Sequence, residues 1–176
     1  MHHFKEYISK KKALNSVEQY YKRWIINIVK GKTIIYPSET FLLPFYKINY
    51  GSNWSTSTFL VNALSGEVLI MPSDQLRRTK LIESLFTSNI LEKTIDEQKA
   101  KEYLIDKLKY NQKKFKLYQK KGFEIREIKF IYYPFYLFYI KNKKYDIALV
   151  DAITAKLDFK NKCYLEKKLL QDYQAI

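Results

Sequence analysis

Side chains that could carry out catalysis are scarce in this sequence. His2 and His3 are the only histidines, and they are adjacent at the N-terminus, where chain ends are usually poorly ordered. A serine or cysteine nucleophile would therefore lack a rigidly held histidine base. Cys163 is the only cysteine, which excludes an intramolecular disulfide and a cysteine-based zinc site. The sequence predicts no catalytic residue, no metal site and no cofactor.

Two further patterns look like motifs of nucleotide binding or catalysis but fit structural roles better. Gly31-Lys-Thr33 looks like the end of a phosphate-binding loop, yet the first glycine of that motif is missing and no strand is expected before it. The carboxylate pairs Glu124/Glu127 and Asp146/Asp151 lie among lysines, which is typical of solvated charge balance rather than acid–base catalysis. We therefore expect a protein that is not an enzyme.

An aromatic run followed by lysines is the strongest candidate for a binding surface. Residues 132–140 read Tyr-Tyr-Pro-Phe-Tyr-Leu-Phe-Tyr-Ile, and strand alternation places apolar or aromatic side chains on both faces. Either the strand is central and covered on both faces, or one face is exposed and contacts a partner. In the second case the rings would stack on bases or form a protein interface. The candidate binding residues are Tyr132, Tyr136, Phe138, Lys141, Lys143 and Lys144, together with Tyr46 in a related segment.

The chain is strongly basic, with 32 Lys and Arg residues against 18 Asp and Glu residues and a formal net charge of +14. Such a charge suits an anionic partner, either a single-stranded nucleic acid or an anionic membrane surface. Only four of the cations are arginines, the residues that grip phosphates and bases in a bidentate way. The excess of Lys, Ile, Asn and Tyr is also typical of an AT-rich coding sequence. Nucleic-acid or anionic-surface binding is therefore the alternative function.

Two blocks of the sequence occur twice. Pro-Phe-Tyr stands at 44–46 and again at 134–136. Downstream, Leu-Val-Asn-Ala-Leu-Ser-Gly-Glu-Val at 60–68 aligns with Leu-Val-Asp-Ala-Ile-Thr-Ala-Lys-Leu at 149–157. The spacing between the blocks differs by a single residue, which a hairpin loop absorbs. The sequence therefore predicts an internal repeat, in which the aromatic run is the central strand of each copy.

A helix is expected before each copy of the repeat. Ser16-Val-Glu-Gln19 and Thr94-Ile-Asp-Glu97 both match the capping box that opens helices. Apolar residues then recur at helical spacing until a glycine, Gly31 in the first helix and Gly122 in the second, favours the end of the helix.

The expected fold class is α+β, with two tandem related units that each consist of a helix packed on an antiparallel β-meander. The units span residues 1–93 and 94–176, each with a trailing helix, from Ser73 and from Cys163. Packing of two like units would give a pseudo-two-fold arrangement.

The repeated hairpin resembles the PepSY-like and cystatin-like α+β modules, in which a Val-Asp-Ala-x-Thr-Gly-x-Val turn closes an antiparallel sheet on one helix. Residues 61–68 keep the glycine of that pattern, whereas Ala155 replaces it in the second copy. The resemblance implies a binding, inhibitory or accessory role without catalysis. At Asn62 and Asp151, the acidic position of the motif, a side chain that caps its own turn is the expected role.

These observations favour a binding protein that acts through a protein or peptide partner, with a sheet edge or the groove between the units as the contact surface. Homodimerisation is also compatible with the aromatic content. The N-terminus lacks the apolar segment of a signal peptide. The longest apolar run, 130–140, has 11 residues where a membrane-spanning helix needs about 20. We therefore expect a cytoplasmic protein.

Overall fold

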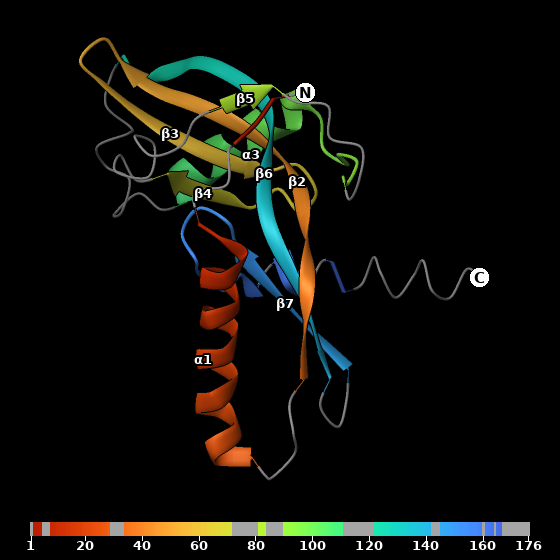
Figure 1. Cartoon of the computed structure of the whole chain (residues 1–176). Helices are drawn as coiled ribbons and strands as arrows, with labels where there is room; N and C mark the ends of the chain where they lie inside the picture. Colours follow the sequence, from red (N-terminus) through yellow and green to blue (C-terminus); the bar gives the residue numbers. More distant parts are fainter. Residues whose placement is uncertain are drawn as a thin grey trace. The chain divides into compact units, whose positions relative to one another are not determined.

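The computed structural model of the chain describes residues 2–4, 8–28, 34–71, 81–83, 90–110, 122–141, 145–159, 161–163 and 165–166. Its helices are α1 (Lys10–Ile28) and α3 (Glu97–Tyr110). Its strands are β1 (His2–Phe4), β2 (Ile34–Ser52), β3 (Ser55–Asn62), β4 (Val68–Met71), β5 (Leu81–Glu83), β6 (Glu124–Lys141) and β7 (Tyr145–Asp151) (Figure 1). The two longest strands, β2 and β6, coincide with the segments richest in aromatic and β-branched residues, which favour strands.

The strands belong to one seven-stranded sheet. Its order is β4-β3-β2-β6-β1-β5, and β7 pairs with β6. The β2–β3, β3–β4 and β6–β7 pairs are antiparallel, and the short β1 is parallel to β6 at His3 and Tyr132. The sheet is thus built mainly from antiparallel neighbours.

Contacts within the chain define two compact units. The first comprises Met1–Phe4 and Leu42–Tyr133, and the second comprises Lys5–Phe41 and Pro134–Ile176. Both β2 and β6 are long enough to contribute residues to each unit. This grouping does not follow the division at residue 93 that the repeat suggests.

The first unit has a core between α3 and the antiparallel strands β2 and β3. The face of α3 that carries Ala100, Leu104 and Leu108 is buried, as its apolar spacing predicts. These side chains share one cluster with residues from the strands, including Tyr46, Ile48, Tyr50, Phe59 and Val61. Alternate positions along β2 therefore face the helix.

The second unit has an equivalent core between α1 and the β6–β7 hairpin. Ala13 and Val17 of α1 are fully buried. They belong to a cluster with Tyr136, Phe138 and Ile140 of β6 and with Ala148 and Val150 of β7. The helix that precedes the first hairpin in the sequence therefore packs in a core with the second hairpin.

The predicted fold class was wrong. The chain is not a tandem pair of helix-on-meander units, because strands dominate the described residues and join one mainly antiparallel sheet. The prediction assumed that each helix packs on the hairpin that follows it. Periodicity shows which face of a helix is apolar but not which strand covers it, and α1 buries that face with β6 and β7.

The starts of both helices differ from the predicted capping boxes. In α1 the cap is Ser9, whose Oγ accepts a hydrogen bond from the backbone N–H of Lys12 at 3.3 Å. Ser16 lies inside the helix and its hydroxyl donates to the carbonyl of Lys12. In α3 the cap is Asp96, whose Oδ1 accepts from the N–H of Lys99 at 2.8 Å. Both helices therefore begin at a different cap from the one that the motif indicated.

The other predicted helical segments are described only in part. The helix expected from Ser73 was wrong where it is described, because Leu81, which it included, lies in strand β5 and pairs with β1. The rest of that segment lies outside the described residues, as does the continuation of the second helix toward Gly122. Residues 161–163 and 165–166 are helical, and Leu165 is buried. No helix in the described ranges is long and apolar enough to cross a membrane.

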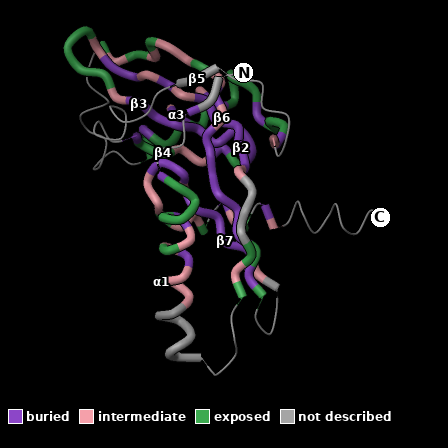
Figure 2. The backbone as a smooth tube through the Cα atoms, viewed as in Figure 1, coloured by how far each residue is buried: buried purple, intermediate pink, exposed green. Residues whose placement is uncertain are grey.

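Each unit contains a buried tyrosine whose hydroxyl binds the backbone at the start of a helix. Tyr46 donates to the carbonyl of Ile95 at 3.1 Å, and Tyr136 donates to the carbonyl of Ile8 at 2.9 Å. Both side chains are buried, with only 2% and 1% exposed. Figure 2 shows that β2 and β6 run through long buried stretches. The amides of the same two isoleucines donate to the carbonyls of Ala63 and Ala152. At each helix start, the N–H and the C=O of one isoleucine are therefore both hydrogen-bonded to the hairpin.

We expect Tyr46→Phe and Tyr136→Phe each to lower the free energy of unfolding by about 1–2 kcal/mol, because each leaves a buried carbonyl without its donor. Urea unfolding monitored by circular dichroism measures the change. Tyr110→Phe is the matched control, since the Tyr110 side chain is 90% exposed and its loss of a hydroxyl should change stability little. Equal stability of all three variants would show that the two hydroxyl bonds do not stabilise the fold.

Candidate functional site

The first unit presents a free sheet edge at β4. Among the described strands, β4 has only β3 as a neighbour. Asn62 donates its N–H to the carbonyl of Glu67, so the hydrogen-bonded pairs of this antiparallel ladder alternate from there. Leu69 and Met71 consequently bond to β3, whereas the N–H and C=O of Val68 and Ile70 point away from it. The outer edge of β4 offers these backbone groups to a further strand.

A tight turn connects β3 to β4 and positions this edge. The side chain of Asn62 caps the turn, because its Oδ1 accepts from the N–H groups of Leu64 and Ser65 at 2.7 and 3.2 Å. Gly66 follows with a φ of 74°, a left-handed conformation that glycine adopts without strain. The expected role of Asn62 as a cap of its own turn is confirmed. In the second unit Asp151 Oδ1 caps an equivalent turn through Ile153 and Thr154.

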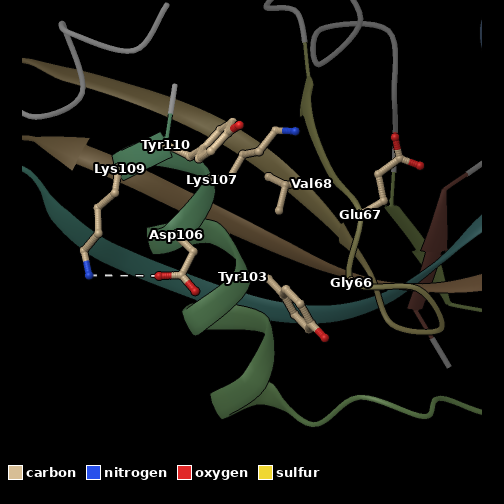
Figure 3. Close-up of a pocket in the computed structure, with 8 residues that line it drawn as sticks. All are labelled: Gly66, Glu67, Val68, Tyr103, Asp106, Lys107, Lys109 and Tyr110. Carbon is tan, nitrogen blue, oxygen red and sulfur yellow. Dashed lines mark ion pairs between the residues drawn. The ribbon is translucent and has the colours of Figure 1, made fainter. Parts of the chain in front are cut away.

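A hollow of about 640 Å³ lies between this turn and α3. Figure 3 shows that Gly66, Glu67 and Val68 form one wall, while Tyr103 and Tyr110 project from α3. The ring of Tyr103 packs on Gly66 so closely that a Cβ built there would lie 2.7 Å from it. The absence of a side chain at Gly66 therefore lets the helix approach the turn.

Apolar groups are exposed on β4 beside the hollow. Ile70 is 42% exposed on the face that carries Val68, and Leu69 is 38% exposed on the opposite face. No charged residue occurs between 68 and 71. The charges at the hollow balance, since Lys107 and Lys109 stand beside Glu67 and Asp106. An ion pair joins the Lys109 Nζ and an Asp106 oxygen at 4.0 Å on the surface (Figure 3). This surface suits an uncharged ligand with apolar side chains.

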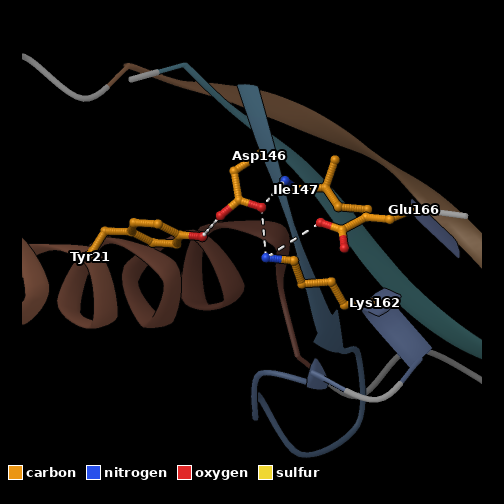
Figure 4. Close-up of polar contacts among 5 residues, drawn as sticks. All are labelled: Tyr21, Asp146, Ile147, Lys162 and Glu166. Carbon is orange, nitrogen blue, oxygen red and sulfur yellow. Dashed lines mark hydrogen bonds and ion pairs between the residues drawn. The ribbon is translucent and has the colours of Figure 1, made fainter. Parts of the chain in front are cut away.

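The second unit contains a half-buried polar cluster (Figure 4). The Asp146 carboxylate on β7 accepts hydrogen bonds from the Tyr21 hydroxyl of α1 and from the Lys162 ammonium, both at 2.6 Å. The backbone N–H of Ile147 donates to the same carboxylate, and Lys162 also pairs with Glu166 at 3.6 Å. With three donors on one carboxylate, the cluster ties Lys162 and Glu166 to α1 and β7.

The protonation states in this cluster follow from burial and from the neighbours. Partial burial alone would raise the pKa of Asp146, but the hydrogen bonds from Lys162 and Tyr21 outweigh it and hold that pKa below its ordinary value. Burial, followed by the hydrogen bond to Asp146, raises the pKa of the Tyr21 phenol. Tyr21 therefore stays protonated as a donor, which suits a structural role rather than that of a general base.

The described residues contain no constellation for metal binding. In particular, no group of three or more His, Cys, Asp or Glu side chains in the described ranges is close enough to hold an ion. Cys163 is exposed.

The predicted binding residues do not come together on one surface. Tyr46, Tyr136 and Phe138 are buried in the cores, so their rings do not form an exposed face. Tyr132 is half-buried beside the ring of Phe130, and burial raises the pKa of its phenol. Lys141 is exposed at the end of β6, and Lys143 and Lys144 lie outside the described residues.

The residues around the hollow were not predicted from the sequence. Tyr103 and Tyr110 fall on a helix whose apolar stripe is Ala100, Leu104 and Leu108, and they lie off that stripe. An aromatic residue on the polar side of an amphipathic helix was the available signal. This signal indicated an exposed ring but did not indicate that the ring of Tyr103 contacts the turn at Gly66.

Comparison with models of protein families, with curated proteins and with solved structures finds no match to this chain. The resemblance to PepSY-like modules stays a prediction.

Gly66→Ala should destabilise the protein by about 1–2 kcal/mol, because the new methyl group meets the Tyr103 ring and the backbone has a positive φ. Thermal unfolding measures this. The matched control is Ala155→Gly, at the equivalent turn position with a φ of 64°, where the change relieves backbone strain. A loss of stability in the control as large as in Gly66→Ala would contradict the role of the Tyr103 contact.

Asp146→Asn should lower the free energy of unfolding by about 1 kcal/mol at neutral pH, a value reduced for partial exposure. Because the folded-state pKa of Asp146 is depressed, its contribution is fully present above the unfolded pKa of about 4 and is lost as pH falls through the folded value. Urea unfolding at neutral pH and at about pH 3 should show the difference from the native protein shrinking. Asp106→Asn, in an exposed pair, is the control and should change stability little at either pH.

Proposed function

We propose that this protein is a non-enzymatic binding protein that captures an extended segment of a partner protein along the outer edge of β4. The segment adds a strand to the sheet, and its side chains contact the exposed apolar groups around the hollow. The observation that carries this proposal is the charge-free edge strand Val68–Met71, with outward backbone groups and partly exposed side chains.

Proteins usually protect the edge of a sheet against unwanted pairing. Lysines, prolines, bulges or short strands serve this purpose in most sheets. Within residues 68–71 the β4 edge has only its shortness as protection, because this strand contains neither a charge nor a proline. A charge-free edge that no other described strand covers, beside an open hollow, supports a role in strand addition.

The electrostatics of this surface favour a protein segment over a nucleic acid. The formal net charge of +14 would attract a polyanion to the protein as a whole. Around the hollow, however, two lysines face two carboxylates, so no local positive field selects phosphate groups. Main-chain hydrogen bonds and apolar contacts do not depend on such a field.

A library of synthetic random peptides, screened against the immobilised full chain, tests this proposal. We expect the selected peptides to be rich in β-forming residues and to lose roughly tenfold in affinity with Ile70→Pro. Proline removes an N–H that points away from β3, so the β3–β4 ladder keeps its bonds. Calorimetric titration gives the affinities.

Ile70→Val is the matched control, because it keeps the N–H and changes only the side chain by one methylene. Peptides that bind Ile70→Pro as tightly as Ile70→Val would refute strand addition at β4. A labelled oligonucleotide, titrated in parallel over a range of salt, separates the proposal from nucleic-acid binding. Strong salt-dependent binding of the oligonucleotide with no peptide selected would favour the alternative.

A further inference from the structure

The second unit repeats the turn and helix of the first unit in hydrogen-bond detail. In the first unit, Ala63 donates to the carbonyl of Pro44 and Gly66 donates to that of Asn62. In the second unit, Ala152 donates to the carbonyl of Pro134, and Ala155 donates to that of Asp151. Each position around the hollow therefore has an identifiable counterpart in the second unit.

The counterparts follow from the registers of helix and strand. Ile95 and Ile8 bind their turns in the same way, so Tyr103 on α3 corresponds to Ser16 on α1, and Lys107 corresponds to Tyr20. Leu157 pairs with Val150 as Val68 pairs with Val61. Two residues later, Phe159 holds the sequence position that corresponds to Ile70, although Phe159 is helical and Ile70 lies in β4.

Aromatic rings occupy this place in the second unit. The rings of Phe159 and Tyr20 lie 5.3 Å apart between their centroids, and Tyr20 also contacts Tyr21 edge-on at 5.3 Å. Such separations are typical of favourable aromatic pairs. The second unit thus fills the space between turn and helix with its own rings.

The first unit leaves the corresponding space open. Its helix carries Lys107 where the second unit has Tyr20, and its strand carries Ile70 where the second unit has Phe159. The hollow remains between Tyr103, Tyr110 and the turn. A ring from outside the chain would meet the faces of these two tyrosines and the cation of Lys107, which attracts an aromatic face.

We propose that the hollow receives an aromatic side chain of the partner segment, in the manner of Phe159 in the second unit. This inference rests on the proposed function, because the ring arrives on the strand that pairs with β4. It adds the chemistry of the anchor residue, which is a phenylalanine, tyrosine or tryptophan flanked by an extended backbone. The apolar edge then supplies affinity, and the hollow supplies selectivity.

The test uses one peptide selected on the full chain and its versions with Phe, Leu or Ala at each position in turn. We expect one position at which Phe binds roughly tenfold more tightly than Leu. The double variant Lys107→Tyr with Ile70→Phe copies the second unit and should fill the hollow with its own rings. In this variant the preference for Phe over Leu at that position should disappear.

Gln98→Tyr is the matched control, because it adds a ring to an exposed position of α3 that does not line the hollow and is not on the face of Tyr103. It should keep the preference for Phe. Thermal unfolding of each variant confirms that it is folded before binding is compared. Peptides that need the β4 edge but show no aromatic preference would overturn this inference and leave the proposed function standing. If no peptide depends on β4 for binding, the proposed function and this inference are both contradicted.

Discussion

The structure depends on the hydrogen bonds that one isoleucine at the start of each helix makes through both its N–H and its C=O. Ile95 and Ile8 donate their amides to an alanine carbonyl of the hairpin turn, and their carbonyls accept a tyrosine hydroxyl from a buried strand position. These bonds fix where each helix begins and which face meets the sheet. The apolar stripe of the helix then falls on the alternating side chains of the strands, and the turn lies beside the helix at a set distance.

The two units share this arrangement of helix and turn but differ in their side chains. A larger side chain on one element is matched by a smaller one on the element that it faces. Where the first unit has a glycine in its turn, the facing helix position is Tyr103. In the second unit Ala155 occupies the turn and the corresponding helix position is the small Ser16. A buried leucine, Leu108, likewise corresponds to Tyr21, which binds Asp146. One unit thus keeps an apolar surface open, whereas the other is closed by rings and by a polar cluster.

The sequence predicted some of these features for physical reasons that the structure makes clear. The Asn62 and Asp151 turns act through contacts between neighbours in sequence, so short motifs revealed them. The repeated Pro-Phe-Tyr was visible as a repeat, but the distant residues that its tyrosines bind were not. The pairing of α1 with the second hairpin involves residues far apart in the chain, and no local pattern carries that information. The aromatic run 132–140 was ambiguous, because a strand buried on both faces and a strand with one exposed apolar face have similar compositions. The hollow at Gly66 depends on an encounter between a turn and a helix and left no motif.

The order of the elements along the chain also has a consequence for folding. The helix-start bond of the first unit joins residues 49 positions apart, whereas that of the second joins residues 128 positions apart. Closing the longer loop has the greater entropic cost and makes the contact slower to form. During synthesis from the N-terminus, α1 leaves the ribosome long before β6 and β7 are made. Its apolar face therefore stays exposed until these strands can cover it. Strands β2 and β3 can pack with α3 in that interval, and β6 then pairs with β2.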